Sequence, residues 1–160
     1  MDVVLGGTVA AAAGEVRAAV ADLAGYPRWL GVVLDVEPDG DGWLVDVGAK
    51  VGPLRRAKRV RMVRVEAPAP AGGGDAVRFE RRELDGADHS PWVLEATVRP
   101  AAEAAAESGA ATTALEVRLH YGGGSPLMAL VEPVLRAEAA RAPGRLEALI
   151  QAERPAAGTG

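Results

Sequence analysis

Three side chains of types that can do chemistry, Arg81, Glu83 and Tyr121, fall where a sheet would aim them toward the interior. If side chains alternate from Phe79 onward, Arg81 and Glu83 point the same way as Phe79. Such a pair can anchor the polar group of a ligand, and the tyrosine hydroxyl can hydrogen-bond a ligand carbonyl or act as an acid. The alternative is structural: Arg81 and Glu83 reach water at a strand end, and Tyr121 is a half-buried aromatic beside three glycines. These residues are therefore candidates for catalysis and for binding, and the sequence leaves open whether the protein is an enzyme.

The two histidines indicate no comparable site. His89 stands between Asp88 and Ser90, but a nucleophile relay depends on a spatial geometry that neighbours in a turn rarely have, so we expect His89 in a hairpin loop. His120 precedes Tyr121 and should alternate to the outer face of the sheet. The chain has no cysteine, which excludes disulfides and thiolate chemistry, and two histidines are too few donors to indicate a metal site. We expect no metal and no cofactor.

A cluster of basic residues lies in one segment of the chain: Arg55, Arg56, Lys58, Arg59 and Arg61. It could attract an anionic membrane surface, a phosphate or an acidic partner, or it could simply be a solvated strand face. No aromatic residue interleaves the run, the formal net charge is −4 and the isoelectric point is near 5.3. Nucleic-acid binding is therefore not expected.

Around these residues the periodicity defines a strand, two short helices and a series of strands. Residues 3–9 predict a strand, followed by a short helix that carries Val16, Val20 and Leu23 at helical spacing and ends at Gly25. The segment 26–30 then predicts a second short helix or a tight turn whose aromatic residues plug the core.

From Leu34 onward the period is two, interrupted by hairpin signals. We expect strands over residues 76–84, 92–99 and 113–121, and one strand over 43–51 with one buried and one wet face. Residues 54–66 keep no single phase, which predicts a β-bulge near Met62. Residues 100–111 predict a loop or a frayed helical turn.

Ser125 and Pro126 are a good helix start, and an apolar stripe continues from Leu127 through Leu130 and Val131 to Ile150. The stripe keeps its phase across two prolines, so we expect one long helix, bent at most. The predicted organisation is a single domain over residues 1–153 and a disordered tail over 154–160.

This order of elements is that of an α+β helix-grip fold, a curved antiparallel sheet wrapped around a long C-terminal helix, with two short helices after the first strand. The chain also resembles the START-like, or SRPBCC, superfamily, which includes polyketide cyclase/dehydrase proteins and carbon monoxide dehydrogenase subunit-like proteins. Four segments carry the resemblance: residues 13–16, 22–30, 51–54 and 119–123. It implies a cavity between sheet and helix that holds lipids, quinones, hormones or polyketide intermediates, and it implies no reaction, since only some members are enzymes.

Three hypotheses follow. The first is a cytoplasmic protein that binds a hydrophobic or aromatic small molecule, such as a lipid, a quinone or a polyketide-like compound. Its cavity would be continuous, with Arg81, Glu83 and Tyr121 as polar contacts and apolar walls formed by Trp29, Trp43, Phe79, Trp92, Leu94, Val117 and Leu119. The second is a polyketide aromatase/cyclase or a dehydratase that uses the three polar residues. The third is an interaction or assembly module without a ligand, whose basic strand docks on an acidic surface and whose interior is filled.

Overall fold

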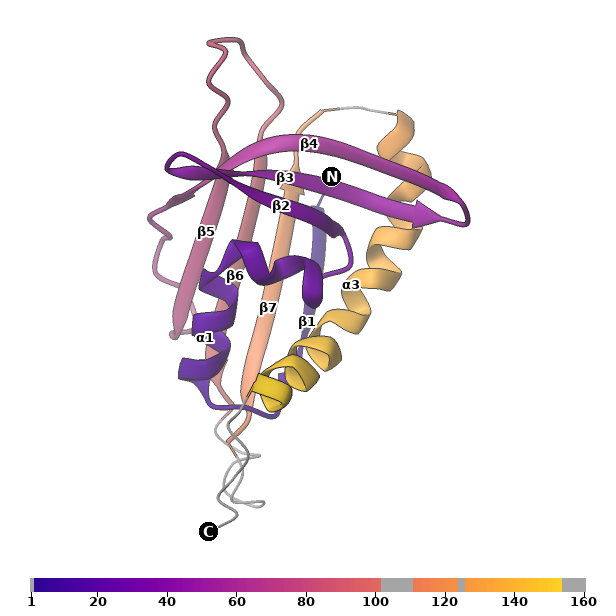
Figure 1. The fold of residues 1–160 in the computed structure, drawn as a ribbon. Helices are drawn as coiled ribbons and strands as arrows, with labels where there is room; N and C mark the ends of the chain where they lie inside the picture. The colour runs from indigo at the N-terminus through magenta and orange to yellow at the C-terminus, as the bar shows by residue number, and fades with distance from the viewer. Residues whose placement is uncertain (1, 102–110, 124–125, 154–160) are drawn as a thin grey trace.

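A computed structural model describes residues 2–101, 111–123 and 126–153 and shows one curved sheet, two short helices and one long helix (Figure 1). The elements in chain order are β1 (Asp2–Val9), α1 (Ala13–Ala21), the 3₁₀ helix η1 (Leu23–Arg28), β2 (Val33–Asp39), β3 (Gly42–Val51), β4 (Leu54–Val65), β5 (Asp75–Arg81), β6 (Trp92–Pro100), β7 (Thr113–Tyr121) and α3 (Pro126–Glu153). This is the helix-grip arrangement that the sequence predicts.

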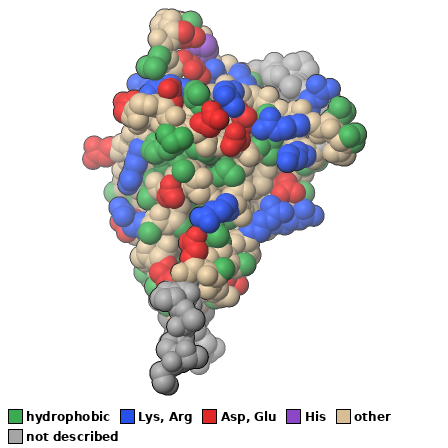
Figure 2. All heavy atoms as spheres, viewed as in Figure 1, with side chains coloured by type: hydrophobic (Ala, Val, Ile, Leu, Met, Phe, Trp, Pro, Cys, Tyr) green, Lys and Arg blue, Asp and Glu red, His purple; other side chains and the backbone are tan. Residues whose placement is uncertain are grey.

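The seven strands form one antiparallel sheet in the order β1-β7-β6-β5-β4-β3-β2. Figure 1 shows β2, β3 and β4 curling over the end of the sheet toward α3, while α1 and η1 cover the concave side. Because β1 and β2 are the two edges, the grip is an open sheet closed by helices rather than a barrel. Figure 2 shows several Lys and Arg side chains, with Asp and Glu side chains among them, over the part of the surface that β3 and β4 form.

The core lies between the concave face of the sheet and α3, as the period-two patterns of β6 and β7 predict. Both strands alternate strictly between buried and more exposed positions, and their buried members are Trp92, Leu94, Ala96, Val98, Leu115, Val117, Leu119 and Tyr121. His120 points to the outer face, where its Nδ1 lies 2.7 Å from Asp2 Oδ1.

The first helix ends earlier than predicted. It stops at Ala21, Asp22 is extended, and Gly25 lies inside η1 instead of ending a helix. Pro27 explains why the second turn cannot continue as an α-helix, since its ring and its missing N–H disrupt the hydrogen-bond ladder. The aromatic plug is confirmed: Tyr26 is buried, and its hydroxyl donates to the carbonyl oxygen of Val20 at 2.6 Å. Burial raises the pKa of Tyr26 far above its usual value, with Asp22 adding to the effect, so this hydroxyl stays protonated.

The predicted β-bulge near Met62 is wrong. β4 pairs with β3 and with β5 without a register shift, and the irregularity lies between Val33 and Asp35 of β2. Three consecutive residues are buried around Met62 because Arg61, on the outer face, is covered by the β2–β3 turn and held by Asp39 and Asp41.

The outer face of β3 is also drier than predicted. Asp46 and Gly48 are both buried there, together with the inward-facing Val45, Val47 and Ala49. Asp46 is covered because Arg55 and Arg59 fold over it, and Gly48 because the backbone of β4 passes close to it.

The long helix α3 is continuous through Pro133 and Pro143, as the phase of its stripe predicts. Its buried side chains are Leu135, Ala139, Ala142, Leu146 and Ile150. The side chains of Leu127, Leu130 and Val131, the Ser125 cap, most of the 100–111 connection and the 154–160 tail lie outside the described residues. The division into a domain and a tail therefore stays a prediction. No helix in the described part of the chain is long and apolar enough to cross a membrane.

Candidate functional site

Two small apolar voids lie in the interior of the grip. The β4-side void is lined by Leu23, Val32, Val33, Val45, Val47, Met62, Trp92, Leu94 and Leu119. The β1-side void is lined by Val3, Leu5, Leu30, Val32, Leu94, Val117, Leu119, Leu135 and Ala139. Each has a volume of about 10 Å³, which is about the room that one water molecule needs.

The two voids share a wall of three aliphatic side chains, Val32, Leu94 and Leu119. Empty space in a protein is energetically costly, because the lining atoms lose contacts that they would have in a filled core. Within the described residues the interior thus holds two separate voids and not the continuous cavity that the binding hypothesis predicts. Displacing the shared wall would join them.

One polar atom faces this apolar interior without a partner. The indole Nε1 of Trp92 is buried, and no described residue accepts its hydrogen. Trp92 lines the β4-side void and packs against Tyr121, with ring centroids 4.7 Å apart. An unpartnered buried donor costs about 1–3 kcal/mol, so a ligand atom that accepts this hydrogen would relieve a cost already present in the fold.

Of the seven predicted apolar wall residues, four line the voids: Trp92, Leu94, Val117 and Leu119. The other three form a chain of edge-to-face and tilted aromatic contacts with Tyr26. Its centroid distances are 4.6 Å from Tyr26 to Trp29, 6.1 Å from Tyr26 to Phe79 and 5.7 Å from Trp43 to Phe79. Trp29, Trp43 and Phe79 therefore stabilise the closed end of the core.

The candidate polar residues gather at the end of the sheet where β5 stops and β7 ends. Arg81 Nε donates to Glu83 Oε1 at 2.8 Å, and Arg81 Nη1 donates to the carbonyl oxygen of Ser90 at 3.2 Å. Burial pushes the pKa of Glu83 up, but hydrogen bonds from the Arg61 amide and from Arg81 outweigh it and leave that pKa below its usual value. Glu83 is thus an ionised partner of Arg81 and not a poised general acid.

Tyr121 and His89 border the same end of the sheet. A Cβ built on Gly123 would lie 3.4 Å from the Tyr121 hydroxyl and 2.8 Å from Ser90 Oγ, so the hydroxyl lies near the loop that holds Arg81. His89 is in that loop, with Nε2 2.8 Å from Asp85 Oδ2 and Nδ1 3.3 Å from Arg81 Nη2. Ser90, His89 and Asp88 form no relay, because the carboxylate that His89 contacts belongs to Asp85.

The basic cluster is divided by the pleat of β4. On the outer face, Arg59 Nε and Arg55 Nη2 both donate to Asp46, at 2.8 and 3.1 Å. The hydrogen bond from Arg59 is the main reason why the pKa of Asp46 is lowered. Arg56 and Lys58 lie on the other, concave face. The sequence predicts the cluster but cannot show this division.

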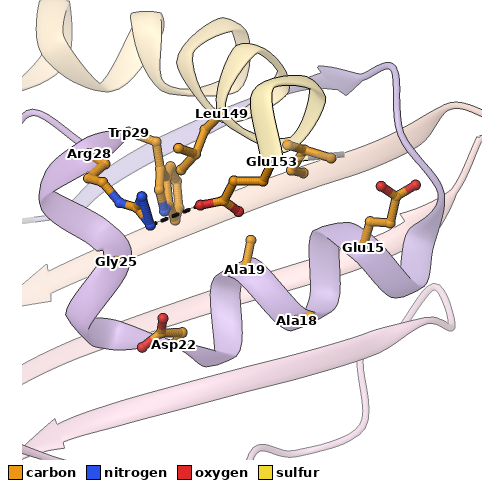
Figure 3. Close-up of a pocket in the computed structure, with 10 residues that line it drawn as sticks. Glu15, Ala18, Ala19, Asp22, Gly25, Arg28, Trp29, Leu149 and Glu153 are labelled. Atoms are coloured by element: carbon orange, nitrogen blue, oxygen red, sulfur yellow. Dashed lines mark hydrogen bonds and ion pairs between the residues drawn. The ribbon is translucent and has the colours of Figure 1, made fainter. Parts of the chain in front are cut away.

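A larger depression of about 360 Å³ opens on the surface between α1, η1 and the last turns of α3. Figure 3 shows Arg28 of η1 reaching across it to Glu153 of α3, with Trp29 beside them; the two charged groups are 2.9 Å apart. Its lining residues are Glu15, Ala18, Ala19, Asp22, Gly25, Arg28, Trp29, Leu149, Ile150 and Glu153. The depression is rimmed by charge and open to solvent, and it does not connect to the lining of either void. In the described part of the chain, no group of three or more His, Asp or Glu side chains could hold a metal ion.

The arrangement of elements matches solved structures over nearly the whole chain. A START superfamily protein from Mycobacterium smegmatis superposes with a TM-score of 0.58 at 17% sequence identity, covering 96% of this chain and 99% of that one. The chain has a START-like fold. A protein from Thermus thermophilus superposes with a TM-score of 0.62 at 17% identity, covering 97% and 100%.

Norcoclaurine synthase from Thalictrum flavum, solved in complex with dopamine and hydroxybenzaldehyde, superposes on the START-like fold with a TM-score of 0.54 at 16% identity, covering 97% of this chain and 88% of that chain. At these identities the comparisons support the fold alone. A scan against family models and a search of curated proteins each found no match.

Several residues that line the interior of this START-like fold were not among the predicted walls. Val45, Val47 and Met62 share the inward phase of β3 and β4, so their period-two spacing could have identified them. Leu23 and Val32 come from η1 and from the connection to β2, where no periodic pattern indicates which way a side chain points.

Proposed function

We propose that this protein binds an apolar small molecule between the sheet and α3, with a hydrogen-bond acceptor of the ligand placed against Trp92 Nε1. The observation that carries the proposal is the unpartnered indole N–H of Trp92 in an apolar void. Buried donors almost always have a partner, and an exception needs an explanation. A ligand carbonyl, hydroxyl or carboxylate oxygen supplies one.

The small size of the voids means that binding requires movement. A ligand would displace the shared wall of Val32, Leu94 and Leu119 and merge the two spaces. This conformational cost lowers the apparent affinity. Lipids, quinones and polyketide-like aromatics all have an apolar body with at least one oxygen acceptor, so they fit the proposal equally well. A protein of the same fold that was solved with dopamine and hydroxybenzaldehyde supports small aromatic compounds as one class to test.

The first experiment is native mass spectrometry of the purified protein, followed by denaturation and extraction of any apolar compound that copurifies. A stoichiometric small molecule identifies the ligand class. The Trp92→Phe variant keeps an aromatic ring and loses the N–H, so it should bind an acceptor-bearing ligand roughly tenfold more weakly and a pure hydrocarbon about equally well. If no compound copurifies and a panel of lipids, quinones and aromatics leaves thermal stability unchanged, the proposal fails.

The assembly-module hypothesis is favoured by one observation, namely that the described interior is nearly filled. It predicts that the same panel leaves stability unchanged while an acidic partner or an anionic membrane surface binds through the basic strand. The enzyme hypothesis, an aromatase/cyclase or dehydratase, would need Arg81 and Tyr121 to contact a substrate held at Trp92. The cytoplasmic location stays a prediction, which subcellular fractionation checks.

A further inference from the structure

We propose that the ligand is an amphipathic anion whose acidic head lies between Lys58 and Arg56 while its apolar body enters the β4-side void. This inference rests on the proposed function and adds the chemical class of the ligand. It follows from the face of β4 on which the two cations lie, from their lack of carboxylate partners among the described residues and from their position above the void.

The register of the β3–β4 ladder places both cations on the concave side. Lys58 lies directly opposite Val47, and Arg56 lies opposite Ala49. Residues directly opposite each other in an antiparallel pair point to the same face of the sheet. Val47 and Ala49 are buried on the core side, so Lys58 and Arg56 point toward the inside of the grip.

Lys58 also reaches across the open mouth of the grip. Its Nζ lies 5.7 Å from the centroid of the Tyr121 ring, although two strands, β5 and β6, separate β4 from β7 in the sheet. Val47, opposite Lys58, lines the β4-side void, and so does Trp92, which packs against Tyr121. The ammonium group of Lys58 is therefore at the rim of that void.

These two cations differ from the other members of the basic cluster in their partners. Arg55, Arg59 and Arg61 all pair with aspartates on the outer face. Among residues 2–101, 111–123 and 126–153, no carboxylate forms an ion pair with Lys58 or Arg56. In a chain with a formal net charge of −4, two unneutralised cations beside an apolar void favour an anion over a neutral or cationic head.

The charge and the void together specify the ligand. An acidic oxygen can accept hydrogen bonds from Lys58 and Arg56, and such charge-assisted bonds are about twice as strong as neutral ones. An apolar body of the same molecule enters past Met62 and Trp92, where every lining side chain is hydrophobic. A neutral alcohol with the same body would gain only the second contribution.

The test is a displacement assay with N-phenyl-1-naphthylamine, a neutral apolar fluorophore, as reporter. Decanoate and decanol compete for it at pH 7.5, since they share one chain and differ in the charge of the head. We expect decanoate to displace the reporter about tenfold more effectively than decanol. This preference should shrink as ionic strength rises, whereas the affinity for decanol should not weaken.

Three variants locate the effect. Lys58→Gln and Arg56→Gln should each reduce the preference for decanoate, to within about twofold in the double variant, and leave reporter binding intact. Arg55→Gln is the matched control, because it makes the same charge change on the same strand but on the outer face, beside Asp46. It should leave the preference unchanged. Thermal unfolding of each variant verifies that the fold is retained.

The outcomes separate this inference from the proposed function. If the reporter does not bind, the proposed function fails and the inference fails with it. If decanoate and decanol compete equally, binding stands and the anionic class is wrong. If the preference is unaffected by Lys58→Gln and Arg56→Gln while all three variants equally weaken cosedimentation with phosphatidylserine vesicles, the cations serve a membrane surface and the inference is overturned.

Discussion

Truncation of Leu94 to alanine is the sharpest test of how the interior is packed. Leu94 lines both voids and is 4% exposed, so its removal joins two spaces of about 10 Å³ each and adds the volume of the lost side chain. Leu→Ala substitutions in cores cost about 3–5 kcal/mol, and the cost rises with the residual cavity because surrounding atoms relax only partly. We expect a loss of about 3 kcal/mol, since the neighbouring voids have already removed some contacts of Leu94.

The assay is urea denaturation at pH 7, followed by circular dichroism. The control is Leu84→Ala, because Leu84 is 76% exposed and its truncation should change stability by less than about 0.5 kcal/mol. A loss below about 1 kcal/mol for Leu94→Ala would mean that this side chain is not packed as described and would refute the argument for a tight shared wall.

The same variant should create a binding site that the wild-type chain has only in latent form. An apolar cavity lined by aliphatic side chains stays dry and takes up small hydrocarbons such as benzene. At a hundredfold excess over its Kd, benzene should restore about 2.7 kcal/mol to Leu94→Ala. Equal stabilisation of Leu84→Ala by benzene would show that the site is unrelated to the enlarged space.

Three further substitutions test the outer face of the sheet and the long helix. Gly48→Ala should cost about 2–3 kcal/mol in urea denaturation, because a Cβ there would clash with the backbone carbonyl oxygen of Arg56, and a cost near zero would contradict the close approach of the two strands. Gly144→Ala should instead stabilise by about 0.5–1 kcal/mol, since it lies in α3 with open space around it. Asp46→Asn should cost about 1 kcal/mol at pH 7, because Arg59 stabilises the ionised carboxylate and lowers its pKa. This contribution is present above about pH 4 and is lost as pH falls through the lowered pKa of Asp46, so wild type and Asp46→Asn should converge in stability near pH 2, and a constant difference would argue against the ion pair.

The elements that the sequence predicts most accurately are those with a strict period. β7 spans Thr113–Tyr121, as its alternation indicates, and β6 begins at Trp92 for the same reason. The pattern fails where burial depends on a distant partner. Arg61 is buried because it meets Asp39 and Asp41 from the β2–β3 turn, and a local reading of the segment takes that burial for a change of phase.

The candidate site could be predicted only in part, for a related reason. Trp92, Leu94, Val117 and Leu119 were accessible to prediction because they lie on regular strands of one buried face. Trp29 is equally apolar and was assigned to the same wall, yet it packs against Tyr26 and lines the surface depression. Composition shows that an aromatic side chain will be buried, but it does not show in which part of the core.

The division of the basic cluster determines which hypothesis the structure favours. A docking surface for an acidic partner needs cations on an accessible outer face, but Arg55 and Arg59 there already share the carboxylate of Asp46. A partner would have to compete with this intramolecular pair, which reduces the gain from each contact. Lys58 and Arg56 have no such competitor among the described residues, and they face the inside of the grip. The electrostatics therefore favour a small anion at the mouth over an acidic protein on the outer face, and the decanoate preference of Lys58→Gln and Arg55→Gln measures that difference directly.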